Sequence, residues 1–311
     1  MYSVLVTGGA GFIGSHIVDA LIKRGDHVRV IDNFSTGSVK NLAGIRASLE
    51  VVEGDIRDIA KIKEAMHGID YVFHQAAFVS VAKSMIEPQQ CIDVNVQGTI
   101  NILNAALLSG VQRVIQASST AIYGDSQQMP LVEETSARPL SPYAASKYTN
   151  EIYGGLYTRA FGLPVVSLRY FNVYGPRQSP KSDYAAAIPI FIRRFLDMKA
   201  PNVHGNGLQS RDFIFVDDVV QANLLAAESD LGAGDVFNIC TGIETCILDL
   251  LQALSVIIPD SKQAEFSPSR AGDIFRSLGN PTRAMRVLGF QPRVSLIEGL
   301  SQTVAAMANE Q

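Results

Sequence analysis

The chain has 311 residues, of which 47% are hydrophobic and 18% are charged, and its formal net charge is −4. This composition is typical of a compact folded enzyme and excludes a disordered chain, because there is enough apolar surface to build a core. No block of like charges is present, which argues against a surface that binds polyanions such as nucleic acid.

The cysteines and histidines do not suggest a disulfide framework or a metal site. Cys91, Cys240 and Cys246 are odd in number and lack C-x-x-C spacing, which fits reduced thiols. The histidines show no ligand spacing such as H-x-x-x-H, so no metal is expected. The first residues read as a strand without a basic leader, and no apolar run approaches the ~18 residues of a membrane span. We therefore expect a cytoplasmic protein.

The first half of the chain alternates short apolar runs with longer segments of helical spacing. The runs lie at 2–7, 27–31, 49–53, 70–74 and 112–118, and one helix is expected at about 88–109. This alternation predicts strands buried on both faces of a parallel sheet. After about residue 175 prolines become frequent and the runs shorten. The predicted fold is therefore α/β: a Rossmann-type doubly wound parallel sheet in 1–174, with a smaller, partly interleaved α/β substrate-binding lobe in 175–311.

The turn after the first strand, in VLVTGGAGFIGSHIVDAL, predicts a dinucleotide site. Gly8, Gly11 and Gly14 let the backbone turn sharply and approach a pyrophosphate at the start of the following helix. Asp32 ends the next strand, where a carboxylate accepts hydrogen bonds from the hydroxyls of the adenine ribose. Residues 33–35 bring no arginine to bind a 2′-phosphate, so NAD is expected rather than NADP.

Two later segments carry groups for chemistry. Residues 117–125 read ASSTAIYGD, with three hydroxyl residues at the end of an apolar run. The segment 140–153, LSPYAASKYTNEIY, predicts a helix with Ser141 as N-cap and Pro142 in its first position. Tyr143 and Lys147 are four residues apart and share one helix face. An adjacent ammonium favours the phenolate of a tyrosine, whose usual pKa is near ~10, and the pair can take a proton from an alcohol as hydride leaves its carbon.

Five motifs follow one another in an order that resembles a known family. They are TGGAGFIG, HQAA at 74–77, SSTAIYG, YAASK and RYFNVYGPR at 169–177. Together they resemble the extended short-chain dehydrogenase/reductases, in the nucleotide-sugar epimerase/dehydratase branch, and the resemblance covers nearly the whole chain. It implies a tightly held NAD in the first domain, a nucleoside-diphosphate sugar in the second, and a homodimer formed through two helices per subunit.

The resemblance also implies roles for individual residues. Tyr143 and Lys147 match the catalytic pair, and Thr120 matches the hydroxyl that bonds the reacting sugar oxygen, while Ser118 and Ser119 are expected to line the cofactor. The implied cofactor-binding residues are Gly8, Gly11, Phe12, Ile13, Gly14, Asp32, Asn33, Ser35, Thr36, Gly37, Asp55, Ile56, Gln75, Ala76, Ala77, Lys83, Asn95, Ser118, Tyr143, Lys147 and Tyr170. The implied substrate-binding residues are Ser80, Thr120, Tyr143, Asn172, Val203, His204, Arg211, Arg270, Asp273 and Ser277.

Several of these positions have a second interpretation from their residue type alone. Asp55 is expected either to lie against the adenine or to cap a helix. Arg211 suits a diphosphate because its guanidinium offers forked donors, and the alternative interpretation is an ordinary surface salt bridge with Asp212 or Asp217. For Arg270, the alternative to phosphate binding is a pair with Asp273 that fixes their own loop.

The residues beside Thr120 limit the reaction. Dehydratases of this branch resemble S-T-D-E-V-Y-G at the hydroxyl cluster, and decarboxylases place a glutamate after the threonine, whereas this chain has Ala121. The site is therefore expected to oxidise and re-reduce C4 of a UDP-sugar without eliminating water or carbon dioxide.

The small Ser277 stands where relatives restricted to plain hexoses often have tyrosine, which favours UDP-N-acetylglucosamine and UDP-N-acetylgalactosamine. Val79, a larger residue than the glycine of N-acetyl specialists, argues against strict specificity. A 4-epimerase limited to UDP-glucose and UDP-galactose, or one acting on UDP-glucuronate, would share the same motifs. A non-enzymatic NAD-sensing module would be expected to lose Tyr143 or Lys147, and this chain keeps both.

Overall fold

The computed structural model describes residues 1–44, 49–180, 187–259, 261–269 and 274–309. Within these residues, seven parallel strands form one sheet in the order β11-β6-β5-β4-β1-β2-β3. The strands are β1 (Ser3–Thr7), β2 (His27–Asp32), β3 (Leu49–Glu53), β4 (Tyr71–His74), β5 (Arg113–Ser119), β6 (Val165–Tyr170) and β11 (Val236–Ile239). The chain reverses its direction of winding between β1 and β4, which is where a doubly wound sheet binds its ligand. The predicted fold class is confirmed.

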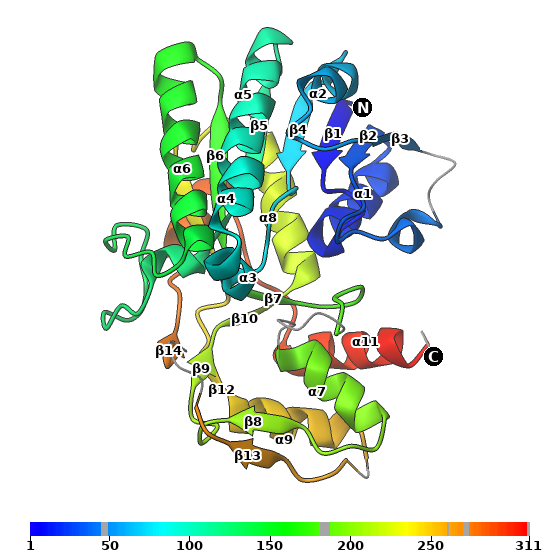
Figure 1. Cartoon of the computed structure of the whole chain (residues 1–311), viewed down its shortest axis with the longest axis vertical. Helices are drawn as coiled ribbons and strands as arrows, with labels where there is room; N and C mark the ends of the chain where they lie inside the picture. The colour runs from blue at the N-terminus through cyan, green and yellow to red at the C-terminus, as the bar shows by residue number, and fades with distance from the viewer. Residues whose placement is uncertain (45–48, 181–186, 260, 270–273, 310–311) are drawn as a thin grey trace.

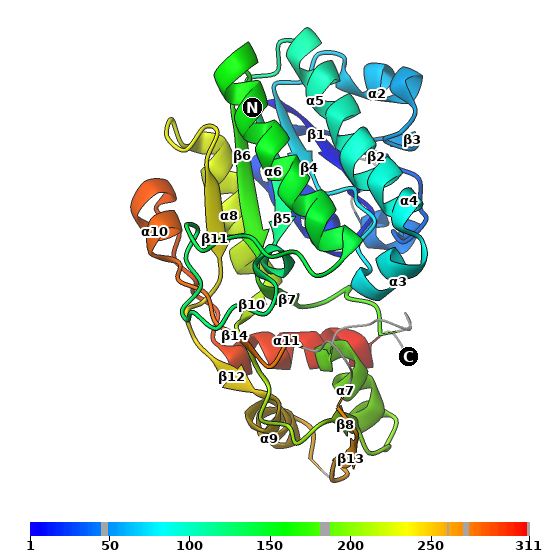
Figure 2. The same ribbon diagram turned by 60° about the vertical axis from the view of Figure 1, so that its left-hand side comes forward.

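Helices cover both faces of this sheet (Figures 1 and 2). One face is packed by α1 (Phe12–Arg24), α8 (Val216–Glu228) and α10 (Thr282–Leu288), and the other by α2 (Ile59–Met66), α5 (Gly98–Leu108) and α6 (Pro142–Phe161). Short helices α3 (Val81–Ile86), α4 (Pro88–Ile92), η1 (Val39–Leu42) and η4 (Thr120–Tyr123) lie in the connections. The sheet strands are buried on both sides, which explains why they read as continuous apolar runs.

The second lobe is built from small sheets and helices around its own apolar cluster. Its strands pair as β7 (Asn172–Tyr174) with β10 (Phe213–Phe215), β8 (Asn202–His204) with β13 (Glu265–Ser267), and β9 (Ser210–Arg211) with both β12 (Thr245–Cys246) and β14 (Arg276–Ser277). The helices are α7 (Ala187–Leu196), α9 (Ile247–Ile257) and α11 (Leu296–Ala308). Because β11 and α8 return to the first sheet, residues beyond 175 belong in part to the larger lobe, and a boundary at 174 stays a prediction.

The helix predicted at about 88–109 runs from Pro88 to Leu108 but is interrupted. Between α4 and α5 it widens into a π-helical segment, η3 (Asp93–Gln97). A π-helical segment interrupts the regular pattern of α-helical hydrogen bonds and often occurs at a functional site. Asn95 is buried within it.

The start of α6 agrees with the sequence-based prediction. Ser141 is the N-cap, its hydroxyl accepts a hydrogen bond from the backbone N–H of Ala144, and Pro142 occupies the first turn.

The cysteines carry free thiols, with Cys91 and Cys240 buried. No helix in the described part of the chain is long and apolar enough to cross a bilayer.

Candidate active site

A cavity of about 520 Å³ opens at the carboxyl ends of the sheet strands. It is lined by eighteen of the residues predicted to bind the cofactor: Gly8, Gly11, Phe12, Ile13, Gly14, Asp32, Asn33, Thr36, Gly37, Asp55, Ile56, Gln75, Ala76, Ala77, Ser118, Tyr143, Lys147 and Tyr170. We call this the cofactor cavity. The parallel strands bring these residues together from positions far apart in the chain.

The glycine turn leaves room for a ligand's phosphates. Gly8 has a φ of 67°, which favours glycine, and a Cβ on Gly14 would lie 2.2 Å from the carbonyl oxygen of Gly8. Gly11 is the N-cap of α1 and makes no side-chain capping bond, and the first turn holds no acidic residue. The uncapped N–H groups of this helix therefore fit the pyrophosphate of a dinucleotide.

Asp32 is held rigidly at the end of β2. Its Oδ2 accepts a hydrogen bond of 2.9 Å from the backbone N–H of Ala10, and its Oδ1 accepts one of 2.8 Å from that of Phe34. Burial raises the pKa of this carboxyl, and the two backbone bonds oppose that rise. The remaining acceptor capacity of Asp32 faces the cofactor cavity, as a ribose-binding carboxylate requires.

Asp55 lies on the wall of the cofactor cavity and is not the cap of α2. Asp58 caps that helix, accepting from the backbone N–H groups of Ala60 and Lys61. Asp55 instead pairs with Arg57 at 2.8 Å, which lowers the pKa of Asp55 to about 2, and accepts a 2.8 Å bond from Asn33.

The reactive corner of the cavity combines α6 with the end of β5. Lys147 Nζ lies 6.0 Å from the ring centre of Tyr143 and donates a 2.9 Å hydrogen bond to the carbonyl oxygen of Ala117. Burial lowers the pKa of Lys147 to about 8. Burial also raises the pKa of Tyr143, and its interaction with the Ser119 side chain opposes that rise. A cation and a hydroxyl thus flank the phenol that is expected to exchange a proton.

The three hydroxyls of ASSTAIYGD occupy different surroundings. Ser118 and Ser119 line the cofactor cavity, and Ser118 Oγ donates to the buried Glu151 at 2.5 Å. Thr120 begins η4 and lines neither the cofactor cavity nor a second cavity in the smaller lobe. Ser119 is therefore the hydroxyl that the structure brings to Tyr143, and a role for Thr120 stays a prediction.

Three predicted cofactor residues lie off the cavity wall. Ser35 is exposed, with its N–H bonded to Asn33. Lys83 Nζ lies 3.4 Å from Glu87 and 5.5 Å from the ring centre of Phe78. Asn95 accepts from the N–H of Phe78 at 2.7 Å and donates to its carbonyl at 3.1 Å. Asn95 therefore supports the loop after β4, which lines the cavity at Gln75, Ala76 and Ala77.

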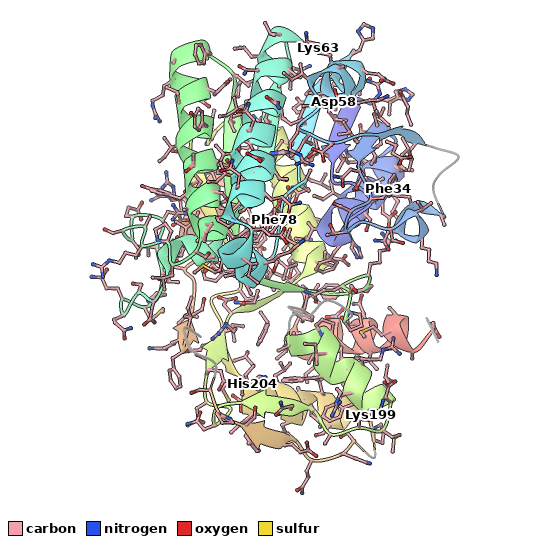
Figure 3. The ribbon with its side chains drawn as sticks, in the orientation of Figure 1. Phe34, Asp58, Lys63, Phe78, Lys199 and His204 are labelled. Atoms are coloured by element: carbon pink, nitrogen blue, oxygen red, sulfur yellow. The ribbon has the colours of Figure 1, made fainter. Side chains whose placement is uncertain are left out.

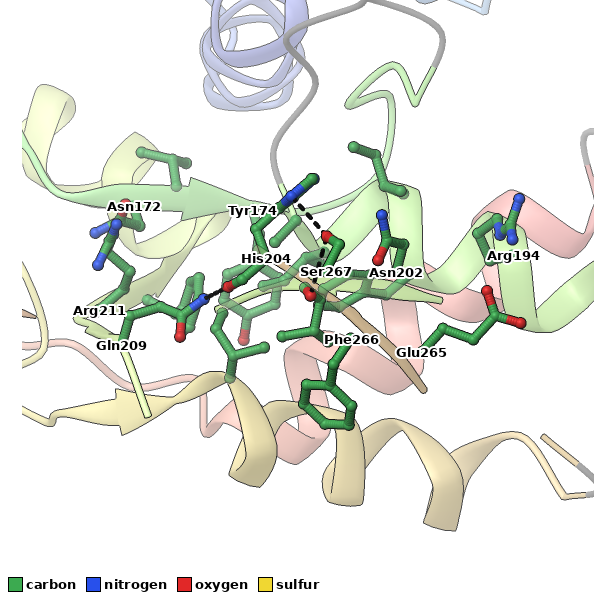
Figure 4. A pocket seen from close by; sticks show the side chains of 18 residues that line it. Asn172, Tyr174, Arg194, Asn202, His204, Gln209, Arg211, Glu265, Phe266 and Ser267 are labelled. Atoms are coloured by element: carbon green, nitrogen blue, oxygen red, sulfur yellow. Dashed lines mark hydrogen bonds between the residues drawn. The ribbon is translucent and has the colours of Figure 1, made fainter. Parts of the chain in front are cut away.

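A second cavity, of about 820 Å³, lies in the smaller lobe between α7 and the β8–β13 pair (Figure 4). It is lined by four predicted substrate residues: Asn172, Val203, His204 and Arg211. Figure 3 places Phe78 beside α3 and α4 and His204 on β8 in the other lobe. Val173 lines both cavities, so a ligand in one adjoins a ligand in the other. We call the cavity of the smaller lobe the substrate cavity.

Hydrogen bonds order the polar wall of the substrate cavity. His204 Nδ1 lies 2.9 Å from Ser267 Oγ, and Gln209 Nε2 donates to the carbonyl oxygen of His204 at 2.6 Å (Figure 4). Asn172 Nδ2 donates to the carbonyl oxygen of Asp212 at 3.2 Å. These bonds fix the strand edges that face the cavity.

Asp212 is buried and holds the segments behind Arg211. Its carboxylate accepts bonds from the N–H and hydroxyl of Thr241 and from the N–H of Gly242 and Gly279. Asp217 was the other carboxylate considered as a partner of Arg211, and its Oδ1 lies 4.0 Å from Nδ1 of His16. Arg211 itself donates a hydrogen bond of 2.8 Å to the carbonyl oxygen of Ser210.

The other predicted substrate residues are placed as follows. Ser80 caps α3 by accepting from the N–H of Lys83. Ser277 is buried on β14, in register with Arg211 on β9, and lines neither cavity. Arg270 and Asp273 lie outside the described residues, and so does any pairing between them.

The cofactor cavity also contains residues that the sequence analysis did not select. Arg177, Gln178 and Ser179, at the end of RYFNVYGPR and just beyond it, line it beside α1. Arg177 Nη2 donates to Asp19 Oδ2 at 2.6 Å, and Arg177 has a φ of 66°, which is rare for a residue other than glycine. The Pro-Arg pair after Gly175 was visible as a turn, but its contact with α1 depends on long-range packing. Among the described residues, no cluster of His, Cys, Asp and Glu gathers as a metal site would.

The sheet order, the glycine turn and the Tyr143–Lys147 corner define a dinucleotide-binding protein of the Rossmann class. Comparison with known proteins agrees. A family model described as the NAD dependent epimerase/dehydratase family matches residues 4–240. A protein of Methanocaldococcus jannaschii named putative UDP-glucose 4-epimerase is 40% identical over 309 residues, covering 98% of each chain.

Two solved structures are similar along their whole length. The UDP-glucose 4-epimerase of Thermotoga maritima, solved with UDP-glucose, is 40% identical over 99% of both chains with a TM-score of 0.95. The UDP-N-acetylglucosamine 4-epimerase of Methanobrevibacter ruminantium, in complex with UDP-N-acetylmuramic acid, is 38% identical over 100% of this chain and 99% of that one, with a TM-score of 0.96. The chain therefore belongs to the NAD-dependent epimerase/dehydratase family, and the predicted family and cofactor, NAD, are confirmed.

Proposed function

We propose that the protein is a 4-epimerase of UDP-sugars that interconverts UDP-N-acetylglucosamine and UDP-N-acetylgalactosamine and also accepts UDP-glucose and UDP-galactose. The observation that carries this proposal is the corner formed by Tyr143, Lys147 and Ser119 in the cofactor cavity, a cavity that shares Val173 with the substrate cavity. Family members with 4-epimerase names that match nearly the full chain support it.

The side chains of this corner can move the proton that the reaction requires. Tyr143 takes the proton of the sugar 4-hydroxyl, Ser119 holds the same oxygen by a hydrogen bond, and Lys147 stabilises the phenolate. The residues of the cofactor cavity would hold NAD, which would supply the acceptor and donor of the hydride exchanged at C4. The oxidised sugar then turns over in the site so that C4 presents its other face for reduction, and Tyr143 returns the proton to the oxygen on C4. Because the cofactor is regenerated in each cycle, the site is suited to hold it permanently.

The charges lining the two cavities favour epimerisation over elimination. In the described part of both walls, the carboxylates are Asp32, Asp55 and Glu265. Asp32 ends β2, Asp55 follows β3, and Glu265 lies on β13 in the other lobe. None of them stands beside Tyr143, and Ala121 supplies none. A site without an acid at this corner has no group to remove water or carbon dioxide.

The cations of the cofactor cavity favour a neutral sugar. Within its described wall they are Lys147 and Arg177. Lys147 is bonded to Ala117 and faces Tyr143, and Arg177 is paired with Asp19. The carboxylate of a glucuronate would need a further cation to pair with near the corner formed by Tyr143, Lys147 and Ser119. A neutral hexose therefore fits this cavity better than the sugar of UDP-glucuronate.

Ser277 and Val79 bear on the N-acetyl group. Ser277 is small and is paired in register with Arg211, a residue of the substrate cavity wall, so a tyrosine at this position would add bulk next to that wall. Val79 lines the cofactor cavity and is 59% exposed, so its side chain is only partly packed against the protein and can make room for a larger sugar substituent. We therefore propose that both acetylated and plain UDP-hexoses are accepted.

A panel of substrates tests this function. Purified protein is incubated without added NAD with UDP-GlcNAc, UDP-GalNAc, UDP-Glc, UDP-Gal and UDP-glucuronate, and the products are separated by sugar-nucleotide chromatography. We expect conversion within the first two pairs and none of UDP-glucuronate. Tyr143→Phe should lose turnover while keeping bound NAD. Full activity of that variant would refute the proton transfer.

A substitution at position 277 tests the acetyl preference separately. Ser277→Tyr should lose turnover of the acetylated sugars and retain that of UDP-glucose, whereas Ser277→Thr, the matched control, should retain both. If the wild-type protein converts plain hexoses alone, the acetyl preference is wrong and the 4-epimerase assignment stands.

We further propose a homodimer in the cytoplasm. On α6, Tyr148, Ile152 and Leu156 are spaced four residues apart and are exposed, and Ile92 on the adjoining α4 is exposed as well. An apolar stripe on two neighbouring helices suits pairing with a second copy. Free, largely buried thiols fit a reducing compartment.

A further inference from the structure

Three successive turns of α6 are bonded to three successive residues of β5. Tyr143 interacts with the Ser119 side chain, Lys147 donates to the carbonyl oxygen of Ala117, and Glu151 accepts from the hydroxyl of Ser118. The first two contacts belong to the reactive corner. The third has no role in the proposed reaction, because Glu151 lines neither cavity.

Glu151 is a buried carboxylate with a fixed geometry. It is 6% exposed and receives two hydrogen bonds from Arg169, of 2.8 Å at Oε1 and 2.7 Å at Oε2. The Ser118 hydroxyl adds a third bond of 2.5 Å. Three donors on one buried carboxylate hold α6, β5 and β6 in one arrangement.

Arg169 is also held by hydrogen bonds to groups other than Glu151. Its Nη1 donates to the hydroxyl of Tyr123 at 2.8 Å, and that hydroxyl donates to Asn238 at 2.6 Å. The same Nη1 donates to the carbonyl oxygen of Glu133 at 3.2 Å. The position of Glu151 therefore depends on a network that reaches β11 and the loop after β5.

The charge of Glu151 acts on Lys147, one helical turn away. The groups that face Lys147 are Tyr143 and Glu151 on α6, Cys91 on α4, His74 on β4 and, through Glu151, Arg169 on β6. Burial lowers the pKa of Lys147, whereas Cys91 and Glu151 raise it. His74 is neutral because burial lowers its pKa to about 3, and the raised pKa of Cys91 keeps its thiol protonated. Among these groups, Glu151 is thus the one that brings a negative charge near neutral pH.

We propose that Glu151 is a positioning residue of the active site: its carboxylate holds the end of β5 through Ser118 and keeps Lys147 in its ammonium form beside Tyr143. This inference rests on the proposed epimerase function, in which that ammonium stabilises the Tyr143 phenolate. Without Glu151, the buried lysine loses its proton at a lower pH, and the tyrosine loses its partner.

The test compares the pH profiles of four proteins: wild type, Glu151→Gln, Glu151→Gln with Arg169→Gln, and Glu133→Gln. The double variant removes both charges of the buried pair, so it avoids the unpaired guanidinium that threatens folding of the single variant. Glu133→Gln is the matched control, because it removes a partly buried carboxyl from the same network without facing Lys147.

We expect the alkaline fall of kcat to move to lower pH by roughly one unit in both Glu151 variants. KM should change less than twofold, because Glu151 touches neither cavity. The control should keep the wild-type profile. Profiles of both Glu151 variants that coincide with that of the wild type would overturn the proposal, and so would an equal shift in Glu133→Gln.

A second measurement does not require turnover. The ionisation of Tyr143 is followed by phenolate absorbance in the NAD-loaded protein, as the difference between each protein and its Tyr143→Phe counterpart. Loss of Glu151 should move this ionisation to higher pH, and an unchanged titration would contradict the proposal. If the wild-type protein converts no UDP-sugar, the proposed function fails while this titration still decides the role of Glu151.

Discussion

Ser119 and Tyr143 both line the cofactor cavity, and the Ser119 side chain lowers the pKa of the Tyr143 phenol against the effect of burial. The next residue, Thr120, turns away into η4. The hydroxyl that meets the reacting oxygen is therefore proposed to belong to Ser119.

Substituting the two hydroxyls separately distinguishes them. Ser119→Ala should lower kcat by roughly 10²-fold, because it removes a donor from the oxygen that changes charge in the reaction. Thr120→Ala should retain kcat within about threefold, since Thr120 lines neither cavity. The initial rate of sugar-nucleotide conversion measures both. The reverse ranking would restore Thr120 to the role that the sequence favoured.

This one-residue difference shows where sequence reasoning reaches its limit. Successive side chains of a strand point to opposite faces, so a motif identifies the strand end but not which of three adjacent hydroxyls faces the ligand. That choice depends on where β5 stops and η4 begins, and both are set by packing. The glycine turn and the Tyr143–Lys147 spacing were predictable, because each is local to one turn or one helix face.

The substrate cavity was harder to predict for the same reason. Its floor pairs Val203 on β8 with Phe266 on β13, a register between segments more than sixty residues apart in the chain. The π-helical segment at Asn95 also escaped prediction, because the apolar spacing of 88–108 continues through it. Burial and tertiary contacts decide such features, and no local pattern records them.

Asp32 should determine the choice between NAD and NADP. Its carboxylate is fixed by the N–H groups of Ala10 and Phe34 and would repel a 2′-phosphate. Asp32→Ala combined with Asn33→Arg should change the NAD/NADP preference by roughly tenfold or more in favour of NADP, because a charge-assisted bond replaces a repulsion. Cofactor affinity is measured by titrating stripped protein. Asn33→Arg alone is the control, and an NADP preference in that variant would show that Asp32 is not the discriminating group.

His74 should make the fold sensitive to acid. It is buried between Thr7 Oγ1, 2.7 Å from Nδ1, and Thr99 Oγ1, 2.9 Å from Nε2, and burial lowers its pKa to about 3. The unfolded chain binds a proton near pH 6.5, whereas the folded chain does not until about pH 3. Stability is therefore lost as the pH falls below 6.5, by about 1.4 kcal/mol per unit.

Comparison with His74→Gln isolates this contribution, because glutamine keeps polar contacts but does not titrate. The difference in unfolding free energy between wild type and variant, from urea titrations, should shrink by about 2 kcal/mol between pH 6.5 and pH 5. A difference that stays constant over this range would mean that His74 is already protonated in the folded protein or does not titrate on unfolding.

The stripe on α6 should control assembly. Ile152, 53% exposed, lies in its middle and lines neither cavity. Ile152→Asp combined with Leu156→Asp should convert the proposed dimer to a monomer, because two charges would be buried without partners at the interface. Light scattering after size exclusion measures the mass. Val256→Asp, on a 73% exposed position of α9, is the matched control and should leave the mass unchanged.

A wild-type monomer at micromolar concentration, or a double variant that stays dimeric, would mean that this stripe is not the dimer interface. Because α6 also carries Tyr143 and Lys147, loss of turnover in a folded monomer would mean that pairing of the helices holds the reactive corner in place.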